Sequence, residues 1–188
     1  MLSSQFQTIG HDLFTRGLVS SHNGNLSIRL GESIIITRRG SMLSCLQEHD
    51  LIETGISKNN RATPLASVEL AVHRAIYQEI SALAVVHAHP PHAVALSLTE
   101  TEIVPSDAEG LSIVGQVPVL GWHMEVRPGG LADIISQALK QCRIVMVHGH
   151  GSFAIGQLLE EVHSCTTMLE ESCRVICLLK SLQVSRNE

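Results

Sequence analysis

The chain has 188 residues, of which 44% are hydrophobic, so it is long enough for one domain, residues 1–188, with a substantial core. Its formal net charge of −5, without a basic stripe and interleaved aromatic residues, argues against a nucleic-acid-binding surface. No apolar stretch reaches the ~18 residues of a membrane span, and the first residues lack a basic flank followed by an apolar signal core. We therefore expect a cytoplasmic protein that does not act on a membrane.

The spacing of apolar residues alternates between helical and strand periods along the chain. In chain order it predicts a helix over 5–19, strands over 24–30 and 33–40, a helix over 67–80, a strand over 83–89, a helix over 91–98, a strand over 116–122, a helix over 129–142, a strand over 143–151 and a helix over 158–182. The first two strands are expected to pair in antiparallel fashion. The predicted buried face of the helix over 67–80 carries Val68, Ala71, Val72, Ala75 and Ile76. This pattern indicates an α/β domain.

The stretch "VVHAHPPHAVALS", residues 85–97, concentrates histidines at the end of an apolar strand. Because side chains alternate faces along a strand, His87 and His89 point the same way and can chelate one divalent metal ion. A catalytic zinc typically has three protein ligands, and His150 is the best third candidate, since glycines on both sides let the backbone approach closely. His92 and His148 remain alternatives on spacing alone.

The five cysteines form no CxxC pair, and the chain shows no secretion signal, so we expect neither disulfides nor a cysteine zinc cluster. Cys173 and Cys177 lie four residues apart in an apolar helical pattern, where cysteine usually acts as a small buried hydrophobe. We assign no chemistry to them.

Four stretches together resemble the class II aldolase/adducin family, which includes fuculose-phosphate aldolases and ribulose-phosphate 4-epimerases. They are "GLVSSHNGNLSIRL", "IIITRRGSMLSCLQEHDLIE", "ASVELAVHRAIYQEISALAVVHAHPPHAVALS" and "VMVHGHGSFAIGQLLEEVHSCTTMLEESCRVI". The resemblance implies an α/β/α three-layer fold with a mostly antiparallel central sheet. It also implies a zinc ion, or another divalent ion, held by His87, His89 and His150. His150, Gly151 and Gly156 match the family's His-Gly-x-x-x-x-Gly spacing, whereas His148 lies two residues too early.

Glu69 occupies the position where the family's aldolases carry the acid that transfers a proton, and His73 and Tyr77 follow it as in the family pattern. Retro-aldol cleavage leaves an enediolate, whose charge a Lewis-acid metal stabilises while a nearby carboxylate moves the proton. The alternative account of Glu69 is that acids favour the first turn of a helix for its dipole. We expect a catalytic Glu69.

The resemblance also marks an anion-binding region for a small sugar or keto substrate. The residues expected there are Asn25, in the Asn23-Gly24-Asn25 turn, Arg39 and Gly40 after the second strand, and Ser67. Here the chain departs from the family: His22 replaces a small hydroxyl residue, Arg38 and Arg39 replace Pro followed by Ser or Thr, and Val68 replaces a second hydroxyl. Because guanidinium binds phosphate or carboxylate with two parallel hydrogen bonds, we expect at least Arg39 to face the anion. The alternative is a solvated turn at a strand end.

The family's aldolases use a tyrosine from a neighbouring subunit or the C-terminal tail to protonate the aldehyde half, and this chain has one tyrosine, Tyr77. Asp107, Glu109, Trp122 and His123 are other candidates, and the residues do not choose among them. The resemblance implies a homotetramer with active sites between subunits, and a charged fraction of 16% agrees with buried interfaces.

The leading expectation is thus a zinc-dependent aldolase that cleaves or forms a carbon–carbon bond in a small ketose phosphate through a metal-stabilised enediolate. A 4-epimerase of the same fold generally has Asp where this chain has Glu69. A dehydratase or decarboxylase would use the same metal, and the altered anion region leaves both open. A non-catalytic, adducin-like interaction module is disfavoured, because the three histidines and Glu69 are present.

Overall fold

A computed structural model describes residues 2–121 and 130–184 of the chain. Its strands are β1 (Asn25–Leu30), β2 (Ser33–Thr37), β3 (Leu51–Gly55), β4 (Ala84–Ala88), β5 (Glu102–Ile103), β6 (Val117–Leu120), β7 (Ile144–Val147) and β8 (Gly151–Gly156). They form one eight-stranded sheet in the order β3-β2-β1-β4-β8-β7-β6-β5. Every neighbouring pair is antiparallel except β6 and β7, which are parallel. The sheet is therefore mostly antiparallel, as expected.

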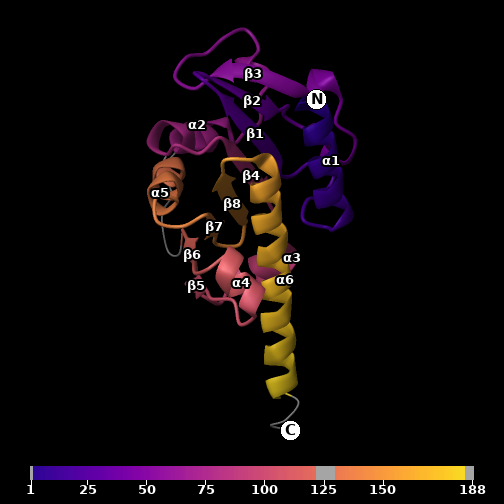
Figure 1. Cartoon of the computed structure of the whole chain (residues 1–188), viewed down its shortest axis with the longest axis vertical. Coiled ribbons are helices and arrows are strands. Elements are labelled where there is room, and N and C mark those ends of the chain that lie inside the picture. Colours follow the sequence, from indigo (N-terminus) through magenta and orange to yellow (C-terminus); the bar gives the residue numbers. More distant parts are fainter. Residues whose placement is uncertain (1, 122–129, 185–188) are drawn as a thin grey trace.

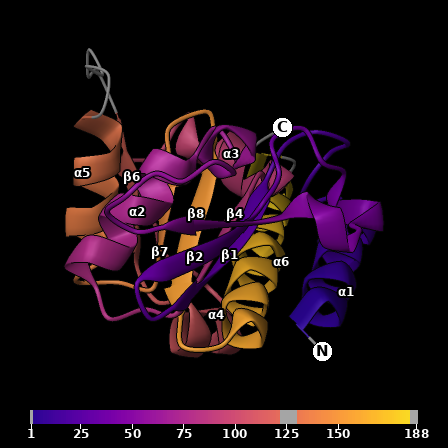
Figure 2. The ribbon, with the colours of Figure 1, turned by 90° about the horizontal axis from the view of Figure 1, so that it is seen from above.

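Helices cover both faces of this sheet (Figures 1 and 2). They are α1 (Leu2–Thr15), α2 (Leu70–Glu79), α3 (Pro91–Ser97), α4 (Ala108–Ile113), α5 (Gly130–Ala138) and α6 (Leu159–Val184), with 3₁₀ turns at Leu43–Cys45, Glu48–Asp50 and Thr63–Leu65. Helices α2 and α5 pack together on one face, while α6 packs with α1, α3 and α4 on the other. Two separate hydrophobic clusters fill the two interfaces. The α/β/α three-layer fold expected from the resemblance is confirmed.

Strand β4, at the centre of the sheet, brings the "HAH" motif into the fold. All five of its residues are buried, because helices cover both faces, and this explains its continuous apolar run. Val86 and Ala88 belong to the cluster under α1 and α6, whereas Val85 belongs to the cluster under α2 and α5. Because side chains alternate faces along a strand, His87 points to the face of the sheet that α2 covers. Helix α2 begins directly after Glu69.

The structure corrects three sequence-based expectations. The segment predicted as one strand over 143–151 ends at Val147, and a turn leads into the separate strand β8. Strand β3 and helix α4 were not predicted at all. In α2 the buried face consists of Leu70, Val72, His73, Ile76 and Tyr77, while Val68 precedes the helix and is 69% exposed. The predicted apolar face thus extended past the start of the helix.

Two further observations concern the cysteines and membranes. All five cysteines are free, and Cys173 is buried in the core, as expected for a small hydrophobe. Within residues 2–121 and 130–184, no helix combines the length and the apolar character needed to cross a membrane.

Candidate metal and active site

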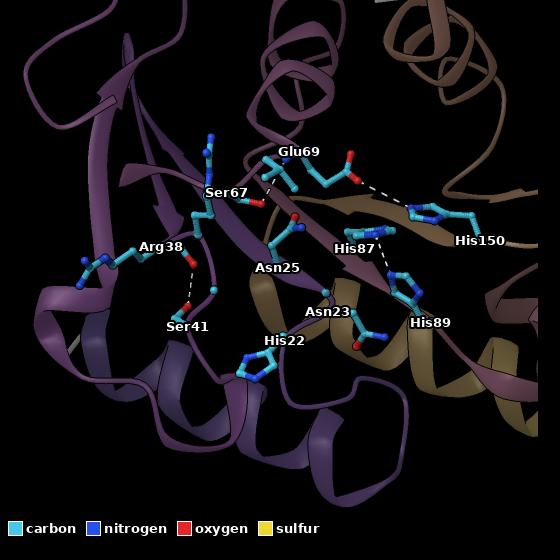
Figure 3. A pocket seen from close by; sticks show the side chains of 14 residues that line it. His22, Asn23, Asn25, Arg38, Ser41, Ser67, Glu69, His87, His89 and His150 are labelled. Atoms are coloured by element: carbon cyan, nitrogen blue, oxygen red, sulfur yellow. Dashed lines mark hydrogen bonds and ion pairs between the residues drawn. The ribbon is translucent and has the colours of Figure 1, made fainter. Parts of the chain in front are cut away.

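Three histidines from the centre of the sheet converge on one point (Figure 3). His87 lies in β4, His89 follows its end, and His150 lies in the turn between β7 and β8. One ring nitrogen of each lies within 4.8 Å of the others, a spacing that one divalent ion can span. The Nε2 atoms of His87 and His89 are 3.0 Å apart. These are the three histidines that the sequence favoured as ligands.

Two of the rings are held in orientations and protonation states suited to metal binding. The Nδ1–H of His87 donates to the Ser152 carbonyl, at 2.9 Å, which leaves Nε2 as the free lone pair. The His87 ring also stacks on Phe153, with centroids 4.2 Å apart. Burial, with the charge of His89 next, lowers the pKa of His87 to about 3, and burial lowers the pKa of His89 to about 4. Both rings are therefore neutral near pH 7.

Gly151 is required where β8 starts beside this cluster. A Cβ atom there would lie 2.4 Å from the Ala88 carbonyl oxygen, 3.2 Å from the His87 ring and 3.3 Å from the His89 ring. Only glycine lets the two backbones approach this closely. The glycine that follows His150 is thus needed for close backbone packing, as the sequence suggested.

Glu69 lies at the edge of the histidine cluster, with Oε1 3.7 Å from His150 Nε2. It occupies the N-cap position of α2, yet its side chain makes no capping hydrogen bond. The interaction with His150 lowers the pKa of Glu69 against the opposing effect of burial, and the charges of His87 and His150 act in the same direction. The carboxylate is directed to the histidines, as Figure 3 shows, so helix capping does not account for it.

A cavity of about 360 Å³ extends from the histidines to the first loops of the chain. The residues that the sequence predicted for the site all line it: His87, His89, His150, Glu69, Asn25, Arg39, Gly40 and Ser67. Asn25 is paired directly with His87 in the β1–β4 register, so the loop expected to bind the anion adjoins the histidine cluster. Gly24, whose φ is +78°, lets the loop pass Val19 and the His87 carbonyl, which a Cβ atom would meet at 2.5 and 3.0 Å.

The two arginines that distinguish this chain from the family pattern also line the cavity, and both are exposed. The Arg38 side chain extends away from the histidines in Figure 3, and its carbonyl accepts a hydrogen bond from Ser41 Oγ at 2.8 Å. Of the two, Arg39 therefore stays the residue expected to meet an anion.

Other candidates lie elsewhere. His92 pairs with Glu170, at 2.6 Å, on the α6 side of the sheet, and it is not among the three clustered histidines. Tyr77 is 1% exposed in the core, and Asp107 caps α4 by accepting from the Gly110 N–H. Trp122 and His123 lie outside the described residues. Sequence reasoning assigned no task to His73, which is fully buried and hydrogen-bonded to Asn25, although its i+4 spacing from Glu69 placed it on the same face of the helix.

A model of the Class II Aldolase and Adducin N-terminal domain matches residues 4–177. The chain belongs to the class II aldolase and adducin family. A crystal structure of L-fuculose-1-phosphate aldolase from Thermus thermophilus superposes with a TM-score of 0.90 at 35% identity, covering 97% of this chain and 95% of that one. An L-fuculose phosphate aldolase of Methanococcus maripaludis (strain C7 / ATCC BAA-1331) is 28% identical over 95% of this chain and 97% of its own length.

A third relative carries a different activity. The probable bifunctional methylthioribose-1-phosphate isomerase/methylthioribulose-1-phosphate dehydratase of Nocardia farcinica (strain IFM 10152) is 35% identical over 88% of this chain, which corresponds to 33% of that protein. The family is metal-dependent, and its lyases carry out more than one reaction, since these relatives are named for aldol cleavage and, in part, for dehydration. In this chain the candidate metal site is the cluster of His87, His89 and His150.

Proposed function

We propose that the protein is a zinc-dependent aldolase that cleaves or forms a carbon–carbon bond in a small ketose phosphate of the fuculose-1-phosphate type. The observation that carries the proposal is the convergence of three histidines and one ionised carboxylate, 3.7 Å from His150, at the end of a cavity lined with anion-binding groups. A non-catalytic module would have no reason to keep a partly buried, charged group at such a cluster.

The histidine cluster fits a divalent metal ion, because His87 and His89 are neutral and His87 is oriented by a second hydrogen bond. Zinc, or another divalent ion, would supply there a Lewis acid that polarises the substrate carbonyl. The remaining work falls to the protein. In cleavage, the hydroxyl group beside the broken carbon–carbon bond loses its proton and becomes the aldehyde carbonyl. The electrons of that bond move into the former ketone, and the carbon of the resulting enediolate takes a proton. Glu69 is placed to move that proton.

The loop end of the cavity would hold the phosphate. Asn25, Ser67 and the backbone of Gly40 offer neutral donors, and Arg39 offers a charged one that can bind two oxygens at once. Binding of the phosphate, away from the reacting carbons, would hold the substrate carbonyl beside the histidines. The binding energy of the phosphate would thus be used to orient the reacting group. The arginine would replace the hydroxyl groups that this chain lacks.

A dehydratase acting on a small sugar phosphate is the second candidate. Two observations favour it: the Nocardia farcinica relative is named for that reaction in part, and Tyr77 is buried with its hydroxyl directed to Ser27, so it cannot protonate an aldehyde in the cavity. Dehydration uses the same metal and the same Glu69 but loses a hydroxyl group instead of breaking a carbon–carbon bond. A decarboxylase also stays a candidate, because the 3-oxo-tetronate 4-phosphate decarboxylase of Cupriavidus necator is 26% identical over 95% of this chain. The epimerase stays a prediction.

The deciding experiment is a coupled assay for dihydroxyacetone phosphate released from fuculose 1-phosphate and related ketose phosphates by the zinc-loaded protein. Glu69→Gln and His89→Ala are the control variants. Release that requires metal and disappears in both variants would support the aldolase. A protein that holds stoichiometric zinc but releases no dihydroxyacetone phosphate, and instead eliminates water from a ketose phosphate, would replace it with the dehydratase.

We also propose the homotetramer with inter-subunit active sites that the resemblance implies. Support comes from the composition, because a charged fraction of only 16% agrees with buried interfaces between subunits. Light scattering coupled to size exclusion measures the assembly directly, and a monomeric, active protein would contradict it. The cytoplasmic location stays a prediction.

A further inference from the structure

Four polar side chains form a hydrogen-bonded chain through the core behind the cavity. Tyr77 Oη lies 2.8 Å from Ser27 Oγ, Ser27 Oγ lies 2.6 Å from His73 Nδ1, and His73 Nε2 lies 2.5 Å from Asn25 Oδ1. Ser27 and His73 are fully buried, and Tyr77 is 1% exposed. Of these four residues only Asn25, the last in the hydrogen-bonded series, lines the cavity. The inner members therefore cannot touch a substrate, and whatever they do for it must pass through Asn25.

The direction of each hydrogen bond follows from its donors and acceptors. Asn25 Oδ1 can only accept, so His73 Nε2 carries the proton. A neutral imidazole carries one proton, which leaves Nδ1 as an acceptor for the Ser27 hydroxyl. Ser27 has then used its proton and must accept from Tyr77. Each group donates to the next toward the cavity, and the last acceptor is the Asn25 carbonyl.

The neutral state of His73 is secured by its surroundings. The ring is fully buried against Phe153, with centroids 6.3 Å apart, and burial lowers its pKa to about 4, against the opposing charge of Glu69. A buried imidazolium would need a carboxylate in contact, and its two hydrogen-bond partners are an amide and a hydroxyl. A single neutral tautomer of His73, with its proton on Nε2, thus satisfies the hydrogen bonds to both Asn25 and Ser27.

We propose that His73 is a positioning residue that fixes the side-chain amide of Asn25 with Oδ1 toward the core and the Nδ2 amino group toward the cavity, where it donates to a phosphate oxygen. Within the described part of the chain, no group accepts a hydrogen bond from Asn25 Nδ2, so both of its protons remain available. Figure 3 shows Asn25 between Ser67 and His87, next to the expected phosphate position. The identity of the anion rests on the proposed function; the orientation of the amide does not.

The orientation of the Asn25 amide decides whether it attracts or repels the anion. An amide turned the other way would present its carbonyl oxygen to the anion and repel it. His73 could accept such a flipped amide only with its proton moved to Nδ1. Ser27 would then accept from His73 and donate to Tyr77, and the buried Tyr77 hydroxyl would have no acceptor among the described residues. The two buried hydroxyls of Ser27 and Tyr77 therefore select the productive tautomer, and through it the donor face of Asn25; without Tyr77, Ser27 alone would be left without an acceptor in the flipped state.

The test uses the full-length, zinc-loaded protein with ¹⁵N label and inorganic phosphate as the probe. Long-range proton–nitrogen NMR spectra identify which nitrogen of His73 is protonated, and a phosphate titration gives the dissociation constant without any turnover. Ser27→Ala removes the donor to Nδ1. Asn25→Asp keeps the acceptor for His73 but replaces the Nδ2 donor by an oxygen. Tyr77→Phe removes a hydroxyl from the same chain while Ser27 still donates to His73.

We expect protonation at Nε2 alone in the wild type and in Tyr77→Phe, a mixture of tautomers in Ser27→Ala, and protonation of both nitrogens in Asn25→Asp, where a carboxylate contacts the ring. The phosphate dissociation constant should rise roughly tenfold in Ser27→Ala, the loss of one hydrogen bond to a charged group, and stay within about twofold in Tyr77→Phe. It should rise further in Asn25→Asp, which also places a negative charge beside the phosphate. Protonation at Nδ1 in the wild type would overturn the inference. So would unchanged phosphate binding in Ser27→Ala, or an equal loss in Tyr77→Phe, which would mean a merely structural role.

Failure of this inference and failure of the proposed function remain distinct. The tautomer and the phosphate affinity are measured without a reaction, whereas the aldolase is judged by the release of dihydroxyacetone phosphate. Phosphate binding that follows the predicted pattern in a protein without aldolase activity would leave the positioning role standing and reject the reaction.

Discussion

Gly151→Ala tests whether the metal site depends on the close approach of β8 to β4. The new Cβ would lie 2.4 Å from the Ala88 carbonyl oxygen, which is 1.0 Å inside the 3.4 Å at which ordinary contact begins. The obstacle is backbone, so no side-chain rotation relieves it, and one strand must move. The same Cβ presses on the rings of His87 and His89, at 3.2 and 3.3 Å. The displacement is therefore transmitted to two of the three expected ligands.

The magnitude follows from the tolerance of metal sites. Metal–ligand distances vary by only about 0.2 Å, so a ligand shift of several tenths of an ångström should lower zinc affinity by about 10–100-fold. Overpacking at a strand should also cost about 1–3 kcal/mol of folding free energy. Zinc affinity is measured by competition with a chromophoric chelator, and stability by urea unfolding of the metal-free protein.

Gly10→Ala is the matched control, because its Cβ would meet the Leu43 carbonyl oxygen at 2.5 Å, a similar backbone clash between α1 and the turn at Leu43–Cys45. It should lose comparable stability and keep its zinc affinity. Wild-type zinc affinity in Gly151→Ala, or an equal loss of zinc in Gly10→Ala, would refute the reasoning that Gly151 protects the ligand geometry.

Three further predictions concern single groups. Glu69→Gln should bind zinc normally, as atomic absorption would show, yet lose about 10²–10⁴-fold in kcat, and a variant that keeps its activity would remove Glu69 from the reaction. The pKa of His73 is lowered to about 4 from an ordinary value of 6.5, so the unfolded chain binds the extra proton between these values and stability falls as pH drops through that window. Urea unfolding of the metal-free protein should show a loss of up to about 1.4 kcal/mol per pH unit from His73 there, added to the losses from His87 and His89, whose pKa values burial lowers as well. A flat profile between pH 6.5 and 4 would contradict the burial argument. Arg39→Ala should raise KM for a phosphorylated substrate about tenfold with little change in kcat, whereas Arg38→Ala, whose side chain extends away from the histidines, should change it much less; equal KM values for wild type and Arg39→Ala would show that Arg39 does not meet the anion.

The sequence was most informative where a strict geometric period applied. Alternation along β4 places His87 and His89 on one face whatever the rest of the fold does, and their ring nitrogens do meet. The third ligand was less certain, because His148, His92 and His150 all follow apolar segments. The structure separates them through a hairpin: β7 ends at Val147, Val147 pairs with Gly151, and His150 projects from the turn between them.

Features that depend on distant pairing escaped the sequence. Strand β8 reads "GSFAIG", without polar alternation, because it is covered on both faces. The predicted strand over 143–151 therefore included only its first residue, and the rest was assigned to no element. The contact between Asn25 and His73 joins residues 48 positions apart and depends on how α2 packs on β1. A histidine four residues after Glu69 signalled the correct helix face, but only the packed structure shows which partner it meets.

The position of Glu69 shows why local preference and function can coincide at one residue. An acid at the start of a helix has a dipole-based explanation, and for Glu69 the backbone does occupy the N-cap position of α2. A capping carboxylate, however, would accept hydrogen bonds from the first turn of its own helix, and this one makes none. It lies against His150 instead, and that contact lowers its pKa. Because the group begins ionised, the proposed reaction requires it to take a proton from the substrate before it can return one. The start of α2 thus places an ionised carboxylate, which does not cap the helix, beside the three histidines expected to bind the metal.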